Sequence, residues 1–130
     1  MPVPTTVNSP YLSSVLISAN TTNATNVKST PGVVHGWALY NINASPRYLK
    51  IYDKATAPTV GTDTPIMTLL IPSNSGNNFE VPKGILCSSG ISFALTTGIT
   101  HADTGAVAAS EIIVNIFYKW GKVTWLILIT

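Results

Sequence analysis

Short runs of alternating hydrophobic and polar residues, separated by clusters of Gly, Pro, Asn and Ser, fill most of this chain. A period of two is typical of strands with one buried face. No segment keeps a helical period over three turns, and only 106–109 is expected to form a single helical turn. The pattern predicts one all-β domain, a β-sandwich or small jelly roll of about eight strands. The expected strands are 13–18, 25–29, 33–42, 47–54, 66–71, 78–81, 85–87, 91–97 and 111–119.

The clearest alternation lies in 33–42 and 47–54, which the turn Asn43–Pro46 joins. Two such runs around a short turn predict a β-hairpin. In the first run the alternation sets Val33, His35, Trp37 and Leu39 against Val34, Ala38, Tyr40 and Ile42. In the second run it sets Leu49 and Ile51 against Tyr48, Lys50 and Tyr52.

The two ends of the chain differ from this middle part. Residues 1–12 carry Pro2, Pro4 and Pro10, which lack a donor for strand pairing, so we expect an extended arm. Residues 123–129 are almost wholly apolar, and such a strand is a hazard on an exposed edge. This run therefore lies between the layers or is covered by another subunit, and we favour the second arrangement. The expected partition is an arm with the first strand (1–19), a sandwich (20–119) and an apolar C-terminal extension (120–130).

Composition narrows the class of protein. Only 9% of the 130 residues are charged, 45% are hydrophobic, and 17 Thr, 12 Ser and 10 Asn supply the neutral polar groups. A coiled coil would be rich in Glu, Lys and Leu, and a disordered chain would be poor in Val, Ile and Leu. The formal charge of +2 is too small to indicate nucleic-acid binding.

Targeting signals are not recognisable in the sequence. The segment Met1–Thr5 has no basic start followed by an apolar stretch, so we expect no secretory signal and synthesis in a cytoplasm. No apolar run approaches the roughly 20 residues that span a bilayer, so no membrane partner is expected. The single cysteine, Cys87, has no partner for an internal disulfide and lies in an apolar run, which favours a buried packing role.

Catalytic and metal-binding patterns are weak. His101 and Asp103, with Asp63, are the best candidates for a metal site, but zinc sites need three or four ligands at recognisable spacing. Turn and cap roles account for Asp53, Asp63 and Asp103 equally well. His35 is expected to be a cross-strand polar residue, and Cys87 has no nucleophile signature around it. We therefore expect neither an enzyme nor a cofactor.

Interaction residues are easier to nominate. Tyr48, Lys50 and Tyr52 share one face of their strand, which suits stacking on a nucleic acid or a protein interface. Arg47 and Lys54 flank them, and we favour the interface over the nucleic acid. At the other end of the chain the predicted anchors are Trp120, Trp125, Leu126 and Leu128.

Residues 20–119 also resemble a family of small β-sandwich structural proteins of tailed bacteriophages. The most specific blocks are Tyr52-Asp53-Lys54 and the segment Pro58–Pro65. The other matching blocks are Thr25–Lys28, Gly36–Asn41, Arg47–Lys54, Gly84-Ile85, Ser89–Ile91, Leu95–Gly98, Asp103-Thr104 and Val114–Lys119.

The resemblance implies a non-enzymatic virion component made in the host bacterial cytoplasm. Its expected form is a capsid decoration or cement protein, a homo-oligomer and most simply a trimer, that adheres to the major capsid protein or another virion protein. A tail, baseplate or fibre module is the alternative, with the loops 55–64 and 98–110 holding a host glycan or surface protein. A carbohydrate-binding module unrelated to virions is a further alternative. The arm 1–19 and the extension 120–130 lie outside the resemblance.

Overall fold

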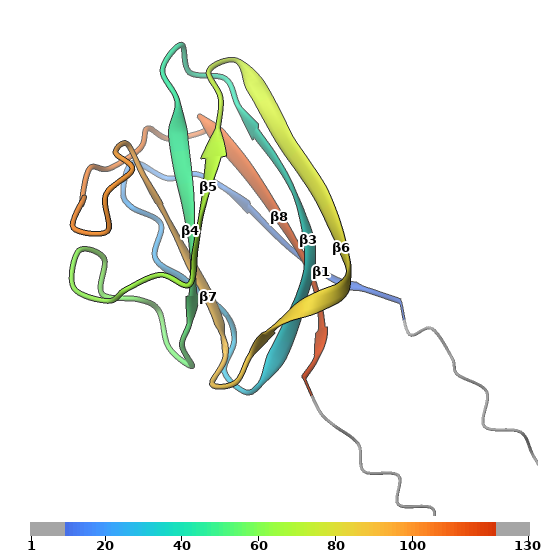
Figure 1. Cartoon of the computed structure of the whole chain (residues 1–130). Coiled ribbons are helices and arrows are strands. Elements are labelled where there is room, and N and C mark those ends of the chain that lie inside the picture. Colours follow the sequence, from blue (N-terminus) through green and yellow to red (C-terminus); the bar gives the residue numbers. More distant parts are fainter. Residues whose placement is uncertain (1–9, 122–130) are drawn as a thin grey trace, which may run out of the picture.

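The computed structural model describes residues 10–121. Period-two alternation produces strands throughout this part of the chain, and Gly, Pro, Asn and Ser occupy the connections (Figure 1). The strands are β1 (Leu12–Ile17), β2 (Thr25–Lys28), β3 (Gly32–Asn41), β4 (Arg47–Asp53), β5 (Met67–Ile71), β6 (Ser75–Cys87), β7 (Ile91–Thr96) and β8 (Ile112–Trp120).

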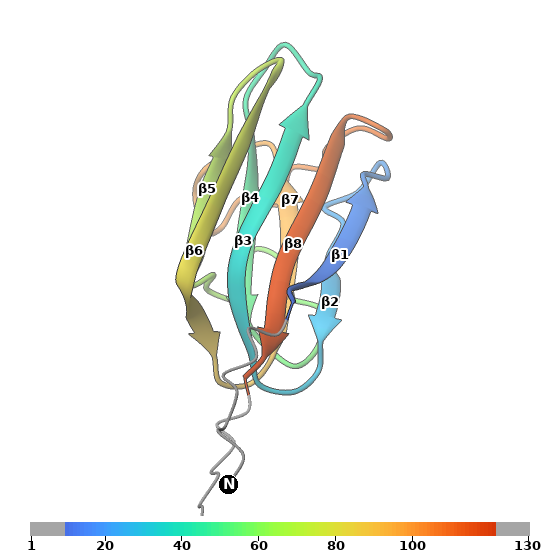
Figure 2. The same cartoon turned by 90° about the vertical axis from the view of Figure 1, so that its right-hand side faces the viewer.

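The strands form two antiparallel four-stranded sheets that face each other (Figure 1). Sheet A has the order β1-β8-β3-β6, and Figure 2 shows it face on; sheet B has the order β2-β7-β4-β5. The predicted all-β sandwich of about eight strands is confirmed. Because β1 pairs with β8 along its whole length, the first strand is an integral part of sheet A.

The core lies between the two sheets and is built from the inward positions of both. Leu49 and Ile51 point into it from β4, as the alternation predicts. The buried cluster comprises Val34, Trp37, Leu39, Leu49, Ile51, Ile71, Cys87, Ile91, Phe93, Leu95, Val107, Ile112, Val114 and Ile116. Burial of these side chains from both layers is the main source of stability in such a fold.

The predicted hairpin between the third and fourth strands is wrong. β3 belongs to sheet A and β4 to sheet B, so residues 42–46 cross from one sheet to the other. Asn41, which is fully buried, stabilises this crossing by donating through Nδ2 to the carbonyl oxygens of Ser45 (2.9 Å), Ile71 (3.3 Å) and Pro72 (3.3 Å). The turn residues are compatible with either connection, and this buried amide favours the crossing.

Strict alternation along β3 is also wrong, because a bulge interrupts it. Val34 and Gly36 pair with the adjacent residues Tyr118 and Phe117 of β8, so His35 is an extra residue in β3. On the other side of β3 the register with β6 jumps from Ile85 to Glu80. Val34 and Trp37 therefore both face the core, although they belong to opposite predicted sides. Gly84 lies within this jump and has a φ of +79°, and a Cβ there would lie 2.1 Å from Val33 Cγ1. The residues predicted as two strands, 78–81 and 85–87, thus form one kinked strand.

The predicted helical turn at 106–109 is wrong as well. These residues belong to an irregular connection between β7 and β8, and Val107 is buried in the core. Across residues 10–121 no helix is long and apolar enough to cross a membrane.

Candidate interaction surface

The face of sheet A that points away from sheet B, here called the outer face, is turned towards the viewer in Figure 2. It carries several exposed apolar side chains. In β8, Ile112, Val114 and Ile116 point into the core, so the residues between them point outward. Residues in register on neighbouring strands share a face. The outer rows are Ile17–Ile113–Tyr40–Gly76, Val15–Asn115–Ala38–Asn78 and Ser13–Phe117–Gly36–Glu80. Among these residues Glu80 alone is charged.

Three residues of the first row, Ile17, Tyr40 and Ile113, form the upper patch together with Ile42, which follows β3. Ile17 and Ile42 are 64% and 62% exposed, far more than core residues of the same type. The four side chains line a shallow hollow of about 130 Å³ together with Ser110–Ile112. A contiguous exposed apolar patch of this kind marks an interaction site more often than a scattering of single apolar residues does.

Tyr11 covers the lower end of the outer face. It directly precedes β1 at one edge of sheet A, yet its hydroxyl donates to Glu80 Oε2 on β6, at the other edge, over 2.7 Å. Its ring stacks on His35 with centroids 4.9 Å apart, and Lys119 Nζ lies 5.1 Å from its centroid. The chain that leads into β1 therefore crosses the outer face.

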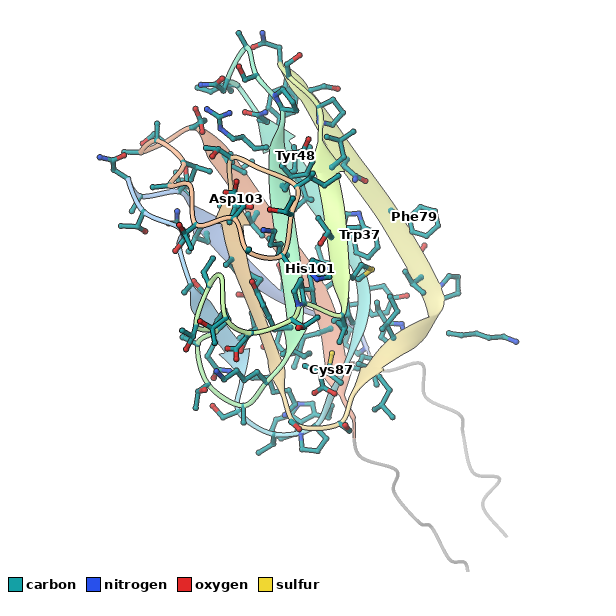
Figure 3. All side chains as sticks on the ribbon, turned by 60° about the vertical axis from the view of Figure 1, so that its left-hand side comes forward. Trp37, Tyr48, Phe79, Cys87, His101 and Asp103 are labelled. Atoms are coloured by element: carbon teal, nitrogen blue, oxygen red, sulfur yellow. The ribbon has the colours of Figure 1, made fainter. Side chains whose placement is uncertain are left out.

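A groove of about 410 Å³ lies beside this crossing. Tyr11 and Phe117 line it from the outer face, whereas Trp37 faces the core. Phe79, in register with Trp37 on β6, has its ring centroid 5.8 Å from that of Trp37. Phe79 is 60% exposed and stands clear of its strand (Figure 3). The lining residues are Tyr11, Trp37, Ala38, Asn78, Phe79, Glu80 and Phe117. Apolar hollows thus lie at both ends of the outer face.

The edge strand β1 lacks the features that protect edges from pairing with other chains. Its sequence, LSSVLI, contains no charge and no proline, and Leu12, Val15 and Ile17 are exposed. Short length, bulges, prolines and charges are the usual protection. β2 is short and bulged. β6 contains Glu80, Pro82 and Lys83. β5 is short and flanked by prolines, and its Leu70 carbonyl accepts from Asn77 Nδ2 at 2.8 Å.

Trp120, one of the predicted anchors, is exposed at the end of β8. Its side chain is 68% accessible, and Lys28 Nζ lies 3.5 Å from its ring centroid. With Thr30, Pro31 and Gly121 it lines a hollow of about 290 Å³. An exposed indole held in place by a cation is a suitable anchor for a partner. The other predicted anchors, Trp125, Leu126 and Leu128, lie outside the described residues.

The predicted interaction face on β4 is not an exposed surface. Tyr48 is partly exposed, but Lys50 and Tyr52 are 0% and 1% accessible. The connections 54–66 and 97–111 cover this side of sheet B; the second carries His101 and Asp103 and lies in front of the sheet in Figure 3. Lys50 Nζ donates to the Thr100 carbonyl inside this layer. A charged and aromatic strand face is typical of a solvated surface, and the covering loops overturn that expectation.

Burial also changes the titration of these two side chains. It lowers the pKa of Lys50, because the charged ammonium loses its hydration, and the negative charge of Asp103 only partly opposes this effect. Burial raises the pKa of Tyr52, with a smaller contribution from Asp63. The Tyr52 hydroxyl has no hydrogen-bond partner among residues 10–121. These groups belong to the packing between sheet B and its loops.

The acidic residues of the two loops make local structural contacts. Asp63 Oδ2 accepts from Lys54 Nζ at 2.5 Å and from the Thr59 amide at 2.7 Å. Asp103 Oδ1 accepts from the Gly105 amide at 2.8 Å, and His101 is exposed. In the described part of the chain, no group of three or more His, Cys, Asp and Glu side chains is placed to hold a metal ion.

Cys87 and His35 are both buried. Cys87 is fully inaccessible in the core, and burial, helped by the charge of Asp53, raises the pKa of its thiol to about 11. Such a thiol is inert in the folded protein. His35 Nδ1 donates to the Val81 carbonyl at 3.0 Å, which fixes the ring beneath Tyr11.

The outer face of sheet A is the surface that sequence reasoning missed. A signal for it is present, because the runs 13–18 and 111–119 carry apolar residues on both alternating sets of positions. Val15 and Ile17 alternate with Leu16, and Ile113 and Phe117 alternate with the core residues of β8. A strand with apolar side chains on both faces buries one face in the core and leaves the other exposed. An exposed apolar face of this kind marks an interaction site.

Comparisons with known protein families, with curated proteins and with solved structures found no match to this chain.

Proposed function

We propose that this chain is a non-enzymatic structural protein of a tailed-bacteriophage virion, a decoration or cement protein that adheres to the capsid lattice as a homo-oligomer, most simply a homotrimer. Its partners are further copies of itself and the major capsid protein or another virion protein. The resemblance of residues 20–119 supports the class of protein, and the outer face of sheet A supports the mode of action.

The observation that carries this proposal is the apolar outer face, which includes Val15, Ile17, Tyr40 and Ile113. These side chains are held on a rigid two-layer sandwich, so little conformational entropy is lost when a partner covers them. A single contact of this size is modest, but many copies on one lattice bind with high avidity. A permanent, multivalent association explains why such a face carries so few charges.

The composition of purified particles tests this proposal. A cement protein is present at hundreds of copies for each particle, whereas tail parts number a few to a few dozen. We expect the higher number from quantitative mass spectrometry of virions that carry this chain, with the major capsid protein as the internal standard. Absence of the chain from purified particles overturns the proposal.

The alternative function is that of a tail, baseplate or fibre module, and the same copy-number measurement distinguishes it from a cement protein. In that case the loops 55–64 and 98–110 would hold a host glycan or protein. Asp63 and Asp103 hold loop backbone and Lys54 in place, which gives these loops a fixed shape. Clear hits on a glycan array together with a low copy number would favour this alternative over the cement protein.

A further inference from the structure

The free edge of β1 offers backbone groups that the rest of the described chain leaves without partners. The Ser18 amide donates to the Ile112 carbonyl at 2.9 Å, so the amide of Ser18 points towards β8. Inward and outward amides alternate along an antiparallel strand. The amides and carbonyls of Ser13, Val15 and Ile17 therefore point away from β8, and among residues 10–121 no hydrogen bond satisfies them.

We propose that this edge receives the apolar run 123–129 of a second copy, which adds a fifth strand to sheet A. The inference rests on the proposed function in that it takes the protein to work as a homo-oligomer. The run, VTWLILI, has no charge and is rich in β-branched and aromatic residues, which favour strands. Val15 and Ile17, each 64% exposed, supply apolar neighbours for its side chains.

The route of the chain favours a second copy over the same copy. The Gly121 amide donates to the Pro31 carbonyl at 3.0 Å, which holds the end of β8 on its β3 side, away from β1. A strand paired with the free edge of β1 would lie about two strand spacings, or about 10 Å, from β8. Reaching it within one copy requires a reversal and about four extended residues of about 3.3 Å each, which leaves about half of the run for pairing. In a second copy the whole run is available.

Pairing between two β1 strands is the other way to cover this edge, and it leaves the apolar runs of both copies uncovered. Donation of the run 123–129 to a second copy instead covers both the free edge of β1 and the run itself. Because donor and acceptor are different parts of the chain, the exchange closes either reciprocally between two copies or around a ring of three or more. This geometry agrees with the proposed trimer.

Cross-linking between two variants that each carry one added cysteine tests the inference. Full-length chains carrying Val15→Cys and Leu126→Cys, with different affinity tags, are co-expressed and treated with a short bismaleimide. Cys87 remains unreactive because it is buried and its thiol pKa is about 11. We expect cross-linked dimers that contain one chain of each kind, in clear excess over products from either variant alone.

Each other outcome overturns the inference. Dimers from Val15→Cys alone show pairing between two β1 strands. A Val15→Cys/Leu126→Cys double variant that cross-links only within one chain shows pairing within a copy. No cross-link in any combination shows that the run binds elsewhere.

A backbone variant gives a second, independent readout. Val15→Pro removes an amide that faces the free edge and leaves the hydrogen bonds to β8 in place, whereas Val15→Thr keeps the amide. Light scattering after gel filtration should show self-association weakened about tenfold or more for the proline variant and unchanged for the threonine variant. Equal association of the two folded variants contradicts the inference. If the wild-type protein is a monomer that still decorates particles, this inference alone is refuted. If it is an oligomer that is absent from particles, the proposed function alone is refuted.

Discussion

Arg47 and Glu111 connect the two sheets at one end of the sandwich. Arg47, at the start of β4, donates through Nε to Glu111 Oε2 over 2.9 Å, and Glu111 directly precedes β8. The Glu111 carboxylate also accepts from Asn43 Nδ2 and from the Ala108 amide. The Glu111 side chain is 4% exposed. One buried carboxylate therefore fixes the crossing segment after β3, the loop before β8 and the first residue of β4.

Loss of this carboxylate should destabilise the fold strongly. Glu111→Gln leaves the Arg47 guanidinium partly buried without its counter-charge, and such a change costs about 3 kcal/mol. Asp63→Asn, which weakens the half-buried ion pair with Lys54, is the matched control and should destabilise the fold much less. Urea denaturation monitored by tryptophan fluorescence measures both values. Equal effects of the two substitutions would contradict the structural role of Glu111.

Acid should weaken the wild-type fold through the same group. Burial alone would raise the pKa of Glu111, but hydrogen bonds from Arg47 and the Ala108 amide outweigh it and lower the pKa below the ordinary value of 4.5. A lowered pKa stabilises the folded state above pH 4.5, and this contribution is lost as the pH falls through the folded-state pKa.

Asp53 adds to this trend. Burial opposes the shift of its pKa, but donation from the amides of Ser88, Ser89 and Gly90 lowers it. We expect the free energy of unfolding to fall below about pH 4.5, less steeply in Glu111→Gln than in the wild type. Identical pH profiles for the two proteins would show that Glu111 does not contribute.

Lys50 should be replaceable by an apolar residue of similar size. Its side chain is fully buried and its ammonium group has one hydrogen bond, to the Thr100 carbonyl. Lys50→Met removes a buried charge and keeps the volume, so the free energy of unfolding should change by less than about 1 kcal/mol or increase. Lys50→Ala also removes the volume and should cost about 2–3 kcal/mol. A large loss for the methionine variant would mean that the charge itself stabilises the loop layer.

Charges on the outer face of sheet A should abolish association without unfolding the protein. Ile17→Lys with Ile113→Lys places two cations on the upper patch at exposed positions, so stability should change by less than about 1 kcal/mol. Leu70→Lys with Ile99→Lys changes two exposed apolar residues outside sheet A and is the control. Gel filtration and particle-binding assays should show loss of association for the first pair alone. Equal loss for both pairs would point to a general solubility effect.

The sequence is sufficient to predict the fold class and most strand positions, because period-two alternation and turn residues are local signals. It is not sufficient to predict which strands pair. The turn 43–46 is compatible with a hairpin, and only the buried contacts of the Asn41 amide with Ser45 and the β5 end show why the chain crosses to the other sheet. The contact with Ile71 at the end of β5 joins residues 30 positions apart, so no local pattern reveals it.

The candidate site was partly predictable for a similar reason. Trp120 is exposed as an anchor should be, since it lies beyond the core positions of β8. Lys50 and Tyr52 are buried by loops whose path over sheet B no periodicity encodes. The outer face depends on the register that brings Ile17, Ile113 and Tyr40 into one row, and register is a property of the assembled sheet.

A reconstruction of the virion that resolves the sandwich is the sharpest test of the proposed function. We expect many copies on the capsid, each with the outer face of sheet A turned against a neighbouring subunit or the capsid lattice and the loops over sheet B turned towards solvent. Copies whose outer face is open to solvent, or density for the sandwich on no part of the particle, would contradict the proposed function.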